Sequence, residues 1–313
     1  MYRAFAASFV AVTGFCVSSA DAVLVFGGTP SSPTASRQLV STTPPPAGSG
    51  QEYVGLYGTS GETRYLGVPI APQHFITAKH VYSEGTGLVL GNTTYTFHSA
   101  HLDPNSDLAI VKVNETFPQF APLYTGTSEV GKAITIFGRG KTAGSLLQTG
   151  SGASSVNNGW LVDGTAVDDR QVSWAADTVD AVANGRIRWN FPPTPGSSTL
   201  TDKDSGGPVF INDGGVTKLA GVNYGISSPF SLSSSGSSPF TATVFNAENL
   251  YANAGTAQAP NWVAVSGVGF SAATRISDHQ AFIAGVVPEP TAPALLALSG
   301  LALLRRRREP SGT

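Results

Sequence analysis

The fold and the chemistry of this chain depend on one stretch, Asp204-Ser205-Gly206-Gly207-Pro208-Val209. Two stretches upstream complement it: Thr-Ala-Lys-His, which ends at His80, and Ser-Asp-Leu-Ala-Ile-Val, which contains Asp107. A serine hydroxyl is a weak nucleophile at neutral pH, so it needs a base to take its proton and a third group to orient that base. His80, Asp107 and Ser205 supply these groups in turn-like and strand-like surroundings. The sequence therefore predicts an activated serine nucleophile.

The composition indicates a turn-rich β protein. The 313 residues suffice for one or two domains with a sizeable core. Only 12% of the residues are charged, and 36 glycines and 21 prolines separate short apolar runs. Runs such as residues 75–78, 108–113 and 133–137 follow at close spacing, which is typical of an all-β barrel or sandwich. The net charge of -2 provides no basic surface, so we expect no nucleic-acid partner.

Residues 1–22 have the pattern of a signal peptide for export. Arg3 provides a positively charged start, an apolar stretch follows, and Ala20-Asp21-Ala22 is a small-x-small cleavage site. A short buried helix is the alternative interpretation. The single cysteine, Cys16, lies within this segment, so the mature chain would have neither a disulfide nor a cysteine nucleophile. Residues 23–50 are rich in proline and serine, and we expect a linker, an arm or a propeptide there.

Residues 286–313 carry three features in a fixed order. The tail begins with Val287-Pro288-Glu289-Pro290, continues as an apolar run from Thr291 to Leu304, and ends in four arginines, 305–308. The run is short for a membrane span, though residues from Ala281 would extend it, and the arginines would keep that end cytoplasmic. This tail closely resembles the PEP-CTERM sorting signal of certain Gram-negative bacteria. The resemblance implies export to the cell surface or extracellular matrix, a transient membrane tether, and processing by an exosortase-type enzyme. A permanent membrane anchor is the alternative.

Three further motifs follow the order typical of one enzyme family. Ile-Thr-Ile-Phe-Gly-Arg-Gly occupies residues 134–140, Ala-Gly-Val-Asn-Tyr-Gly occupies residues 220–225, and a strand-and-helix pattern runs from 274 to 283. Together with the histidine, aspartate and serine stretches, they make residues 52–285 resemble a trypsin-like serine protease of the chymotrypsin fold, S1 type.

The resemblance implies an all-β fold and a hydrolytic activity. The fold would be two six-stranded antiparallel β-barrels, about residues 51–125 and 126–285, with a short C-terminal helix. The activity would be that of a serine endopeptidase that acts on proteins or peptides and needs no cofactor. Ser205 would attack the peptide carbonyl to form an acyl-enzyme, His80 would act as the base, and Asp107 would hold and stabilise the imidazolium.

Lys203 departs from the family pattern, in which glycine is usual at this position. The resemblance implies that the backbone N–H groups of Lys203 and Ser205 hold the oxyanion. If the position requires a positive φ, lysine adds strain and misplaces one donor. The alternative function is therefore that of a catalytically weak homologue acting as a cell-surface or matrix binding protein. A structural matrix protein is a further alternative.

The start of the mature enzyme is a separate question. In the family, the aspartate that matches Asp204 pairs with a newly freed N-terminal amine. No Ile-Val-Gly-Gly start is evident, and Arg37-Gln38-Leu39-Val40 is the best candidate for that terminus. An enzyme active without such processing is the alternative.

The resemblance also assigns a substrate pocket. Thr199 would form its base, and Asn223, Tyr224 and Gly225 would form a wall, with a segment near Ser271 opposite. An uncharged base predicts a small or medium uncharged side chain next to the cleaved bond, although Asp202 lies close by. Residues 226–269 read as an insertion beside this cleft.

Other polar and aromatic residues have less specific roles. Asp103 competes with Asp107, which is favoured because it directly precedes an apolar strand. Three aspartates, Asp163, Asp168 and Asp169, are candidates for a calcium loop but lack a ligand pattern, so we expect no metal. We expect the other histidines on surfaces or strand ends: His74, His98, His101 and His279. We expect the tryptophans to anchor the packing of the core: Trp160, Trp174, Trp189 and Trp262.

Overall fold

The computed structural model describes residues 23–59, 62–162, 171–256 and 258–287. In these residues the strands form a closed barrel, a larger second sheet and three small sheets, and the only α-helix of the described part is α1 (Gln280–Val286). No helix within these ranges has the length and apolar character needed to cross a membrane. The signal peptide and the sorting tail from residue 288 lie outside the described residues.

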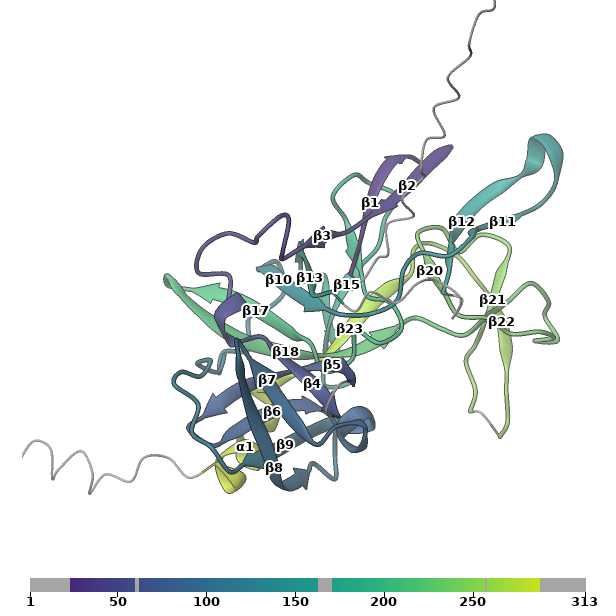
Figure 1. Cartoon of the computed structure of the whole chain (residues 1–313). Coiled ribbons are helices and arrows are strands. Elements are labelled where there is room, and N and C mark those ends of the chain that lie inside the picture. The colour runs from purple at the N-terminus through teal and green to yellow at the C-terminus, as the bar shows by residue number, and fades with distance from the viewer. Residues whose placement is uncertain (1–22, 60–61, 163–170, 257, 288–313) are drawn as a thin grey trace, which may run out of the picture.

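Six strands close the first barrel in the order β4-β5-β6-β9-β8-β7, with all neighbours antiparallel (Figure 1). Strands β6 and β9 come from uninterrupted apolar runs and are buried along most of their length, whereas β8 is polar and largely exposed. Each fully buried Leu, Ile or Phe contributes roughly 1.5–3 kcal/mol through removal of apolar surface from water. The barrel strands are β4 (Gly55–Thr59), β5 (Glu62–Ala71), β6 (His74–Ala78), β7 (Gly87–Leu90), β8 (Thr93–Leu102) and β9 (Leu108–Val113).

The second unit is a sheet of eight strands in the order β14-β15-β23-β18-β17-β10-β13-β3. The sequence predicts a second six-stranded barrel here, and in the described residues the six central strands form a sheet that β14 and β3 extend at its two ends. The all-β class with one short C-terminal helix is confirmed. These strands are β3 (Gln38–Leu39), β10 (Ala133–Gly138), β13 (Ser173–Thr178), β14 (Ala181–Ala183), β15 (Arg186–Asn190), β17 (Pro208–Asp213), β18 (Val216–Ile226) and β23 (Phe270–Arg275).

The N-terminal segment is part of the body of the protein. Strand β1 (Leu24–Thr29) forms a hairpin with β2 (Ser32–Ser36) and pairs on its other side with β16 (Ser198–Thr199). Phe26 is buried in an aromatic cluster whose other members are Trp160, Phe191 and Phe245. The sequence shows no periodic apolar face here because the apolar residues 23–26 are consecutive, and both faces of the strand are buried there: Val25 packs in one apolar cluster and Phe26 in another.

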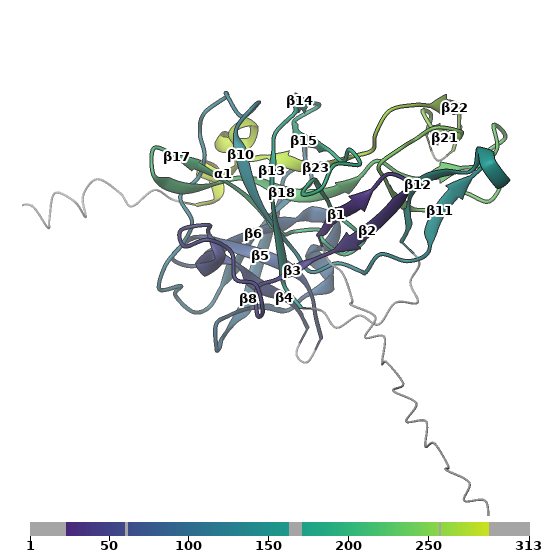
Figure 2. The same ribbon diagram turned by 90° about the horizontal axis from the view of Figure 1, so that it is seen from above.

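The predicted insertion, residues 226–269, forms most of a separate lobe. It contributes β19 (Phe230–Ser231), β20 (Ala242–Val244), β21 (Leu250–Asn253) and β22 (Trp262–Val265), and β20 pairs with β12 (Val156–Leu161) of the β11 (Leu146–Thr149) hairpin. The lobe has its own apolar cluster. Figures 1 and 2 both show it at the end of the molecule away from the first barrel. The remaining elements are four 3-10 helices, η1 (Gln51–Tyr53), η2 (Lys79–Glu84), η3 (Gly152–Ser154) and η4 (Ile276–His279).

A buried ion pair fastens the segment between the two units. Glu129 has no exposed surface and accepts two hydrogen bonds from Arg275, from Nε at 2.8 Å and from Nη2 at 2.7 Å. Asp278 accepts a further hydrogen bond from Arg275 Nη1 at 2.7 Å. The Ser277 hydroxyl donates to Glu129 at 3.0 Å. Burial alone would raise the pKa of Glu129, but the bonds from Arg275 and Ser277 outweigh it and lower that pKa. The carboxylate is therefore charged when the chain is folded at neutral pH.

Replacing Glu129 by alanine leaves the Arg275 guanidinium buried with its main partner gone. We expect the free energy of unfolding to fall by about 3–5 kcal/mol, measured by urea denaturation. Asp213→Ala is the matched control, because Asp213 pairs with Lys218 at 2.8 Å on the exposed surface, and it should change little. Equal effects of the two substitutions would contradict the structural role given to the Glu129–Arg275 pair.

Candidate active site

The histidine, aspartate and serine singled out by the sequence come together in one line. His80 lies in η2 directly after β6, Asp107 directly precedes β9, and Ser205 lies in the loop before β17. His80 Nδ1 is 2.7 Å from Asp107 Oδ2, and His80 Nε2 is 2.7 Å from Ser205 Oγ. Both contacts have ordinary hydrogen-bond lengths. The three groups are thus arranged so that a proton can pass from Ser205 to His80 while Asp107 holds the ring.

The surroundings of Asp107 fix the orientation of the imidazole. Its second oxygen accepts the backbone N–H of His80 at 3.0 Å, and its own carbonyl accepts the N–H of Lys79 at 3.0 Å. A carboxylate only accepts hydrogen bonds, so the ring proton lies on Nδ1 and Nε2 is free to accept from Ser205. The Asp107 side chain is 12% exposed and the His80 side chain 43%, which leaves the imidazole open to a ligand.

Asp103, the competing aspartate, has a different partner. It is buried, and its carboxylate accepts from Asn105 N at 2.9 Å and Ser106 Oγ at 2.6 Å and lies 2.8 Å from His279 Nδ1. Burial raises the pKa of Asp103, but the bonds from Ser106 and Asn105, with help from His279 and Lys79, outweigh it and lower that pKa. His279 was expected at a surface or strand end, and it instead joins η4 to the first barrel.

Two glycines let the nucleophile loop approach the first barrel. Gly206 has φ +82°, and a Cβ there would lie 2.3 Å from Thr77 Oγ1 and 2.5 Å from the carbonyl oxygen of Leu66. Thr77 itself donates to that carbonyl at 2.9 Å, so neither atom can withdraw easily. A Cβ on Gly207 would lie 2.2 Å from the carbonyl oxygen of Phe137. The loop therefore sits at backbone contact distance from both units.

The substitution Gly206→Ala tests this close approach. Gly214→Ala is the matched control, because Gly214 also has a positive φ of +64° but a Cβ at that position would meet no atom within 4 Å. Both variants incur the backbone penalty, and only Gly206→Ala adds the collision. We expect Gly206→Ala to lower the free energy of unfolding by about 1–3 kcal/mol more than the control, measured by thermal and urea denaturation. Equal losses would mean that the loop does not lie against the first barrel.

Lys203 adopts the positive φ at which, according to the sequence analysis, lysine would be strained. Its φ is +78°, and its ammonium group donates to Tyr65 Oη at 3.0 Å across the two units. The bond to Tyr65, which outweighs partial burial, raises the pKa of Lys203. Within the described residues, the backbone N–H groups of Lys203 and Ser205 donate to no protein acceptor. Lysine therefore occupies a position that favours glycine and leaves both donors available.

The carboxylate of Asp204 is sealed inside the second unit. It accepts N–H groups from Gly140 at 2.7 Å, Thr201 at 2.7 Å and Val23 at 3.2 Å. Burial raises the pKa of Asp204 to about 6, although these backbone bonds act in the opposite direction. Space for the group comes from Gly138, where a Cβ would lie 2.1 Å from Asp204 Oδ1. The Gly-x-Gly motif of β10 thus makes room for this carboxylate.

Val23, from the N-terminal part of the chain, is bonded to the Asp204 carboxylate. The predicted candidate for the mature N-terminus, residues 37–40, lies elsewhere. Leu39 is instead paired in β3 with Ser173 of β13, at the outer strand of the sheet. Val23 is fully buried and has φ +32°, an outlier for a β-branched residue. One signal in the sequence pointed to Val23, since it directly follows the predicted cleavage site.

The predicted pocket residues fall into two groups. Thr199 is buried, and its hydroxyl lies 3.0 Å from that of Ser271, so the two satisfy each other. Asn223 is also buried, and its amide donates to the carbonyls of Phe137 at 2.8 Å and Asp204 at 3.2 Å. Tyr224 is 37% exposed, and its ring centroid lies 6.1 Å from that of His80. Asn223 thus supports the loop from behind, and Tyr224 faces the site.

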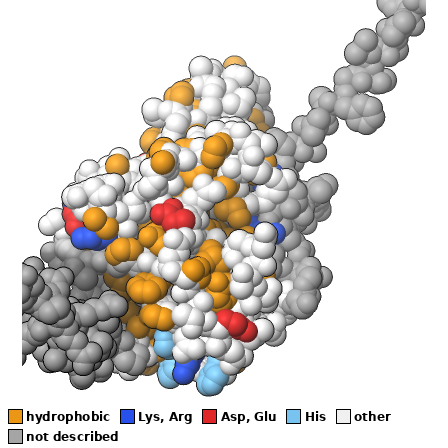
Figure 3. All heavy atoms as spheres, turned by 60° about the vertical axis from the view of Figure 1, so that its left-hand side comes forward, with side chains coloured by type: hydrophobic (Ala, Val, Ile, Leu, Met, Phe, Trp, Pro, Cys, Tyr) orange, Lys and Arg blue, Asp and Glu red, His pale blue; other side chains and the backbone are white. Residues whose placement is uncertain are grey.

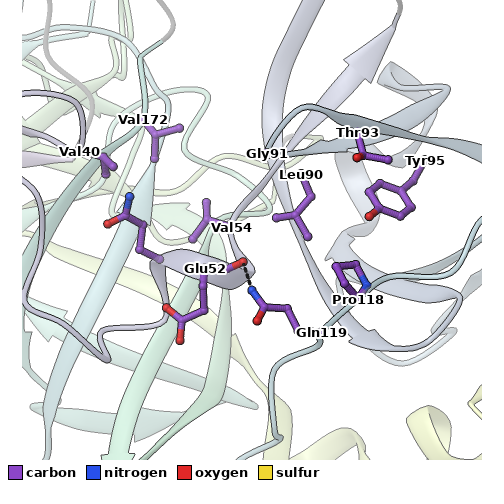
Figure 4. Close-up of a pocket in the computed structure, with 11 residues that line it drawn as sticks. Val40, Glu52, Val54, Leu90, Gly91, Thr93, Tyr95, Pro118, Gln119 and Val172 are labelled. Atoms are coloured by element: carbon purple, nitrogen blue, oxygen red, sulfur yellow. Dashed lines mark hydrogen bonds between the residues drawn. The ribbon is translucent and has the colours of Figure 1, made fainter.

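Asp202 pairs with Lys141 at 2.8 Å, so its charge is matched outside the pocket base. A hollow of about 600 Å³ lies between η1, the β7–β8 turn and the loop carrying Gln119, and none of His80, Asp107 and Ser205 lines it (Figure 4). On another face, apolar side chains gather with only scattered charges between them (Figure 3). No group of three or more potential metal ligands occurs in the described ranges, and the calcium-loop candidates, Asp163, Asp168 and Asp169, lie outside them.

No family model and no curated protein matches this chain. Among solved structures, neuropsin, a serine protease expressed in the limbic system of mouse brain, is similar with 12% sequence identity and a TM-score of 0.49, over 77% of this chain and 96% of that chain. A structure described as HBP is similar with 15% identity and a TM-score of 0.46, over 79% of this chain and 96% of that chain. At such low identity, the chemistry of the site has to be derived from the residues of this chain.

Proposed function

We propose that this chain is an exported serine endopeptidase that hydrolyses peptide bonds through an acyl-enzyme. The observation that supports it is the unbroken line from Asp107 through His80 to Ser205, with both contacts at 2.7 Å. A histidine that served only to pack the interior would not need a second ring nitrogen directed at a partly exposed hydroxyl, as His80 Nε2 is directed at Ser205 Oγ. The residues named in the sequence analysis as catalytic keep the same roles in this proposal.

The proposed reaction needs only groups of this chain and water. His80 Nε2 takes the proton of Ser205 as its oxygen attacks the peptide carbonyl, and the imidazolium is stabilised by Asp107. The tetrahedral oxyanion is held by the N–H groups of Lys203 and Ser205, each such donor being worth about 3–4 kcal/mol of barrier. His80 then protonates the leaving amine, and water repeats the sequence to release the acid.

The pocket next to the cleaved bond is proposed to take an uncharged side chain. Its base, Thr199 with Ser271, consists of two hydroxyls that hydrogen-bond to each other at 3.0 Å. A lysine or arginine side chain would arrive there without a counter-charge, and its desolvation would not be repaid. A small or medium uncharged residue is therefore the favoured one.

Two substitutions that each disturb a histidine–aspartate pair test the proposed chemistry. Asp107→Asn should lower kcat by roughly 10⁴-fold because the ring loses its correct tautomer. Asp103→Asn, which disturbs the buried pair with His279, should lower stability and leave kcat nearly unchanged. Ser205→Ala should abolish both turnover of a casein substrate and covalent labelling by a fluorophosphonate. A wild-type protein that neither cleaves casein nor reacts with the probe would favour the binding-protein alternative.

We also propose that the mature chain begins at Val23, which fits removal of residues 1–22 on export. A cut at that bond turns the Val23 N–H, 3.2 Å from Asp204 Oδ2, into an ammonium group. The fully buried Asp204 carboxylate has no cationic side chain bonded to it in the described residues, and an ammonium would supply the missing charge. The φ of +32° at Val23 also exists only while the preceding residue is attached. Charge and strain both favour the cut chain.

Chains that differ only at the N-terminus test this start. A protein released from a cleavable fusion so that it begins at Val23 should be active, and one that retains Ala20-Asp21-Ala22 should be at least about 100-fold less active. Asp204→Asn in the Val23 chain should remove that advantage, whereas Asp202→Asn, on the surface beside Lys141, should preserve it. Equal activity with and without the three extra residues would contradict the proposal.

The location of the protein remains a proposal drawn from its two ends. We propose export by the N-terminal signal and a transient membrane tether through the tail, with exosortase-type processing near Pro288-Glu289-Pro290. The destination would be the cell surface or matrix of a Gram-negative bacterium. Mass spectrometry of the secreted protein gives both mature ends in one measurement, and an intact C-terminal tail would favour a permanent anchor.

A further inference from the structure

A hollow in the surface lies next to Tyr224, the residue whose ring is near His80. This hollow, of about 290 Å³, opens between the second sheet and the lobe, and its lining includes Arg186, Arg188, Tyr224, Gly225, Phe270 and Ala272. Asn253 and Ala252 of β21 close it from the side of the lobe. The strands that carry these residues can be followed in Figure 2. The hollow is separate from the pocket base at Thr199.

The register of three strands explains why the hollow exists. Arg186 and Arg188 are two residues apart in β15, so their side chains stand on the same face of the sheet. Arg188 pairs with Ala272 of β23, and Ala272 pairs in turn with Gly225 of β18. A Cβ built on Gly225 meets no atom within 4 Å. The small residues Ala272 and Gly225 thus form a low floor beside two long cationic side chains.

Both guanidinium groups are held against aromatic rings. The Arg186 Cζ lies 3.5 Å from the centroid of the Tyr224 ring, and the Arg188 Cζ lies 4.6 Å from that of Phe270. Such stacking orients the guanidinium plane and leaves its N–H edge available for a planar acceptor. The two arginines are therefore positioned before any ligand arrives.

The two arginines lack a protein acceptor in the described part of the chain. Neither side chain forms a hydrogen bond or ion pair there, and Arg188 Nε is buried without a partner. The carboxylates nearby are already engaged: Asp107 with His80, Asp278 with Arg275, and Asp180 with the N–H of Asn190 at 2.7 Å. A buried donor without an acceptor costs stability, so it marks a place where a ligand can supply one.

The hollow also lies where an extended substrate would pass. Strand β17 pairs with β18 only as far as Val222, so the same edge of β18 is left without a strand partner from Tyr224 onward among the described residues. The Tyr224 ring is near both groups: its centroid lies 6.1 Å from that of the His80 ring and 3.5 Å from the Arg186 Cζ. The His80 ring and the Arg186 guanidinium are therefore separated by at most about three residues of extended peptide, at about 3.3 Å per residue.

We propose that this hollow binds a carboxylate side chain of the substrate, two to four residues from the cleaved bond. The proposal rests on the endopeptidase function and names its substrate class: peptides with Glu or Asp near an uncharged residue at the cleaved bond. A carboxylate matches the guanidinium edge with two parallel N–H···O bonds and accepts from groups that now have no acceptor. The apolar surroundings at Phe230 and Pro229 fit the methylene stem of glutamate better than a shorter, fully hydrated side chain.

A peptide series measures the preference directly. Internally quenched peptides with Glu, Gln, Ala or Lys at each of four positions on both sides of one cleavable bond are compared by kcat/KM. We expect Glu to exceed Gln by about tenfold or more at one position on one side only. Arg188→Gln and Arg186→Gln should each bring that ratio close to one. Lys218→Gln, which removes the same charge at the far end of β18, should leave the ratio at its wild-type value.

A second measurement separates failure of this site from failure of the proposed reaction. Fluorophosphonate labelling of Ser205 shows whether each variant is folded around a reactive serine. Fluorescence anisotropy then measures binding of the Glu and Gln peptides to Ser205→Ala, alone and combined with Arg188→Gln. If Ser205 is labelled but no Glu preference is found, the carboxylate site is overturned and the proposed endopeptidase function is not. No labelling, with Glu-selective binding that Arg188→Gln removes, supports the site and overturns the endopeptidase. Equal binding of Glu and Gln peptides overturns the site in either case.

Discussion

The Asp204 carboxylate, buried without a side-chain cation in the described residues, constrains the backbone around Ser205. Its two oxygens are held by backbone N–H groups from three segments, at Val23, Gly140 and Thr201. Because Ser205 is the next residue, fixing that carboxylate fixes the backbone from which the hydroxyl projects. The missing side chain at Gly138 is the condition for this packing, since any Cβ would overlap the carboxylate. A charge buried this deeply is costly, and hydrogen bonds from these N–H groups offset part of that cost.

The site also depends on the seam between the first barrel and the second sheet. The first barrel carries His80 and Asp107, and the second sheet carries Ser205, so a shift of one unit against the other would break the 2.7 Å contact. Several polar contacts cross or flank this seam, including Lys203 with Tyr65 at 3.0 Å and His279 with Asp103 at 2.8 Å. Hydrogen bonds with defined geometry resist sliding in a way that apolar contact alone does not. Lys203 thereby helps to align the second sheet with the first barrel, through a hydrogen bond that glycine, which has no side chain, could not form.

The sequence predicted what is encoded locally and missed what depends on distant contacts. The apolar runs that became β6, β9 and β10 were visible because each keeps its pattern over several residues, and His80, Asp107 and Ser205 were visible because each lies in a short motif. The contact between Asp204 and Val23 was not visible, because the two residues are 181 positions apart and Val23 opens a segment whose proline and serine content resembles a linker. His279 was placed at a surface because its partner Asp103 belongs to the other unit. The arginines of β15 were not singled out, since only strand pairing sets them beside Tyr224.

The charge balance of the chain explains why acidic recognition would need such a local device. The net charge is -2, so the protein as a whole repels an acidic peptide weakly at long range. At physiological ionic strength that repulsion is screened beyond about 8 Å, whereas a guanidinium–carboxylate contact in a half-enclosed hollow is screened far less. The pocket base, with its paired hydroxyls, offers a carboxylate no compensation for lost water. In the proposed function, negative charge would therefore be accommodated where Arg186 and Arg188 stand, and the residue at the cleaved bond would be selected by size and neutrality.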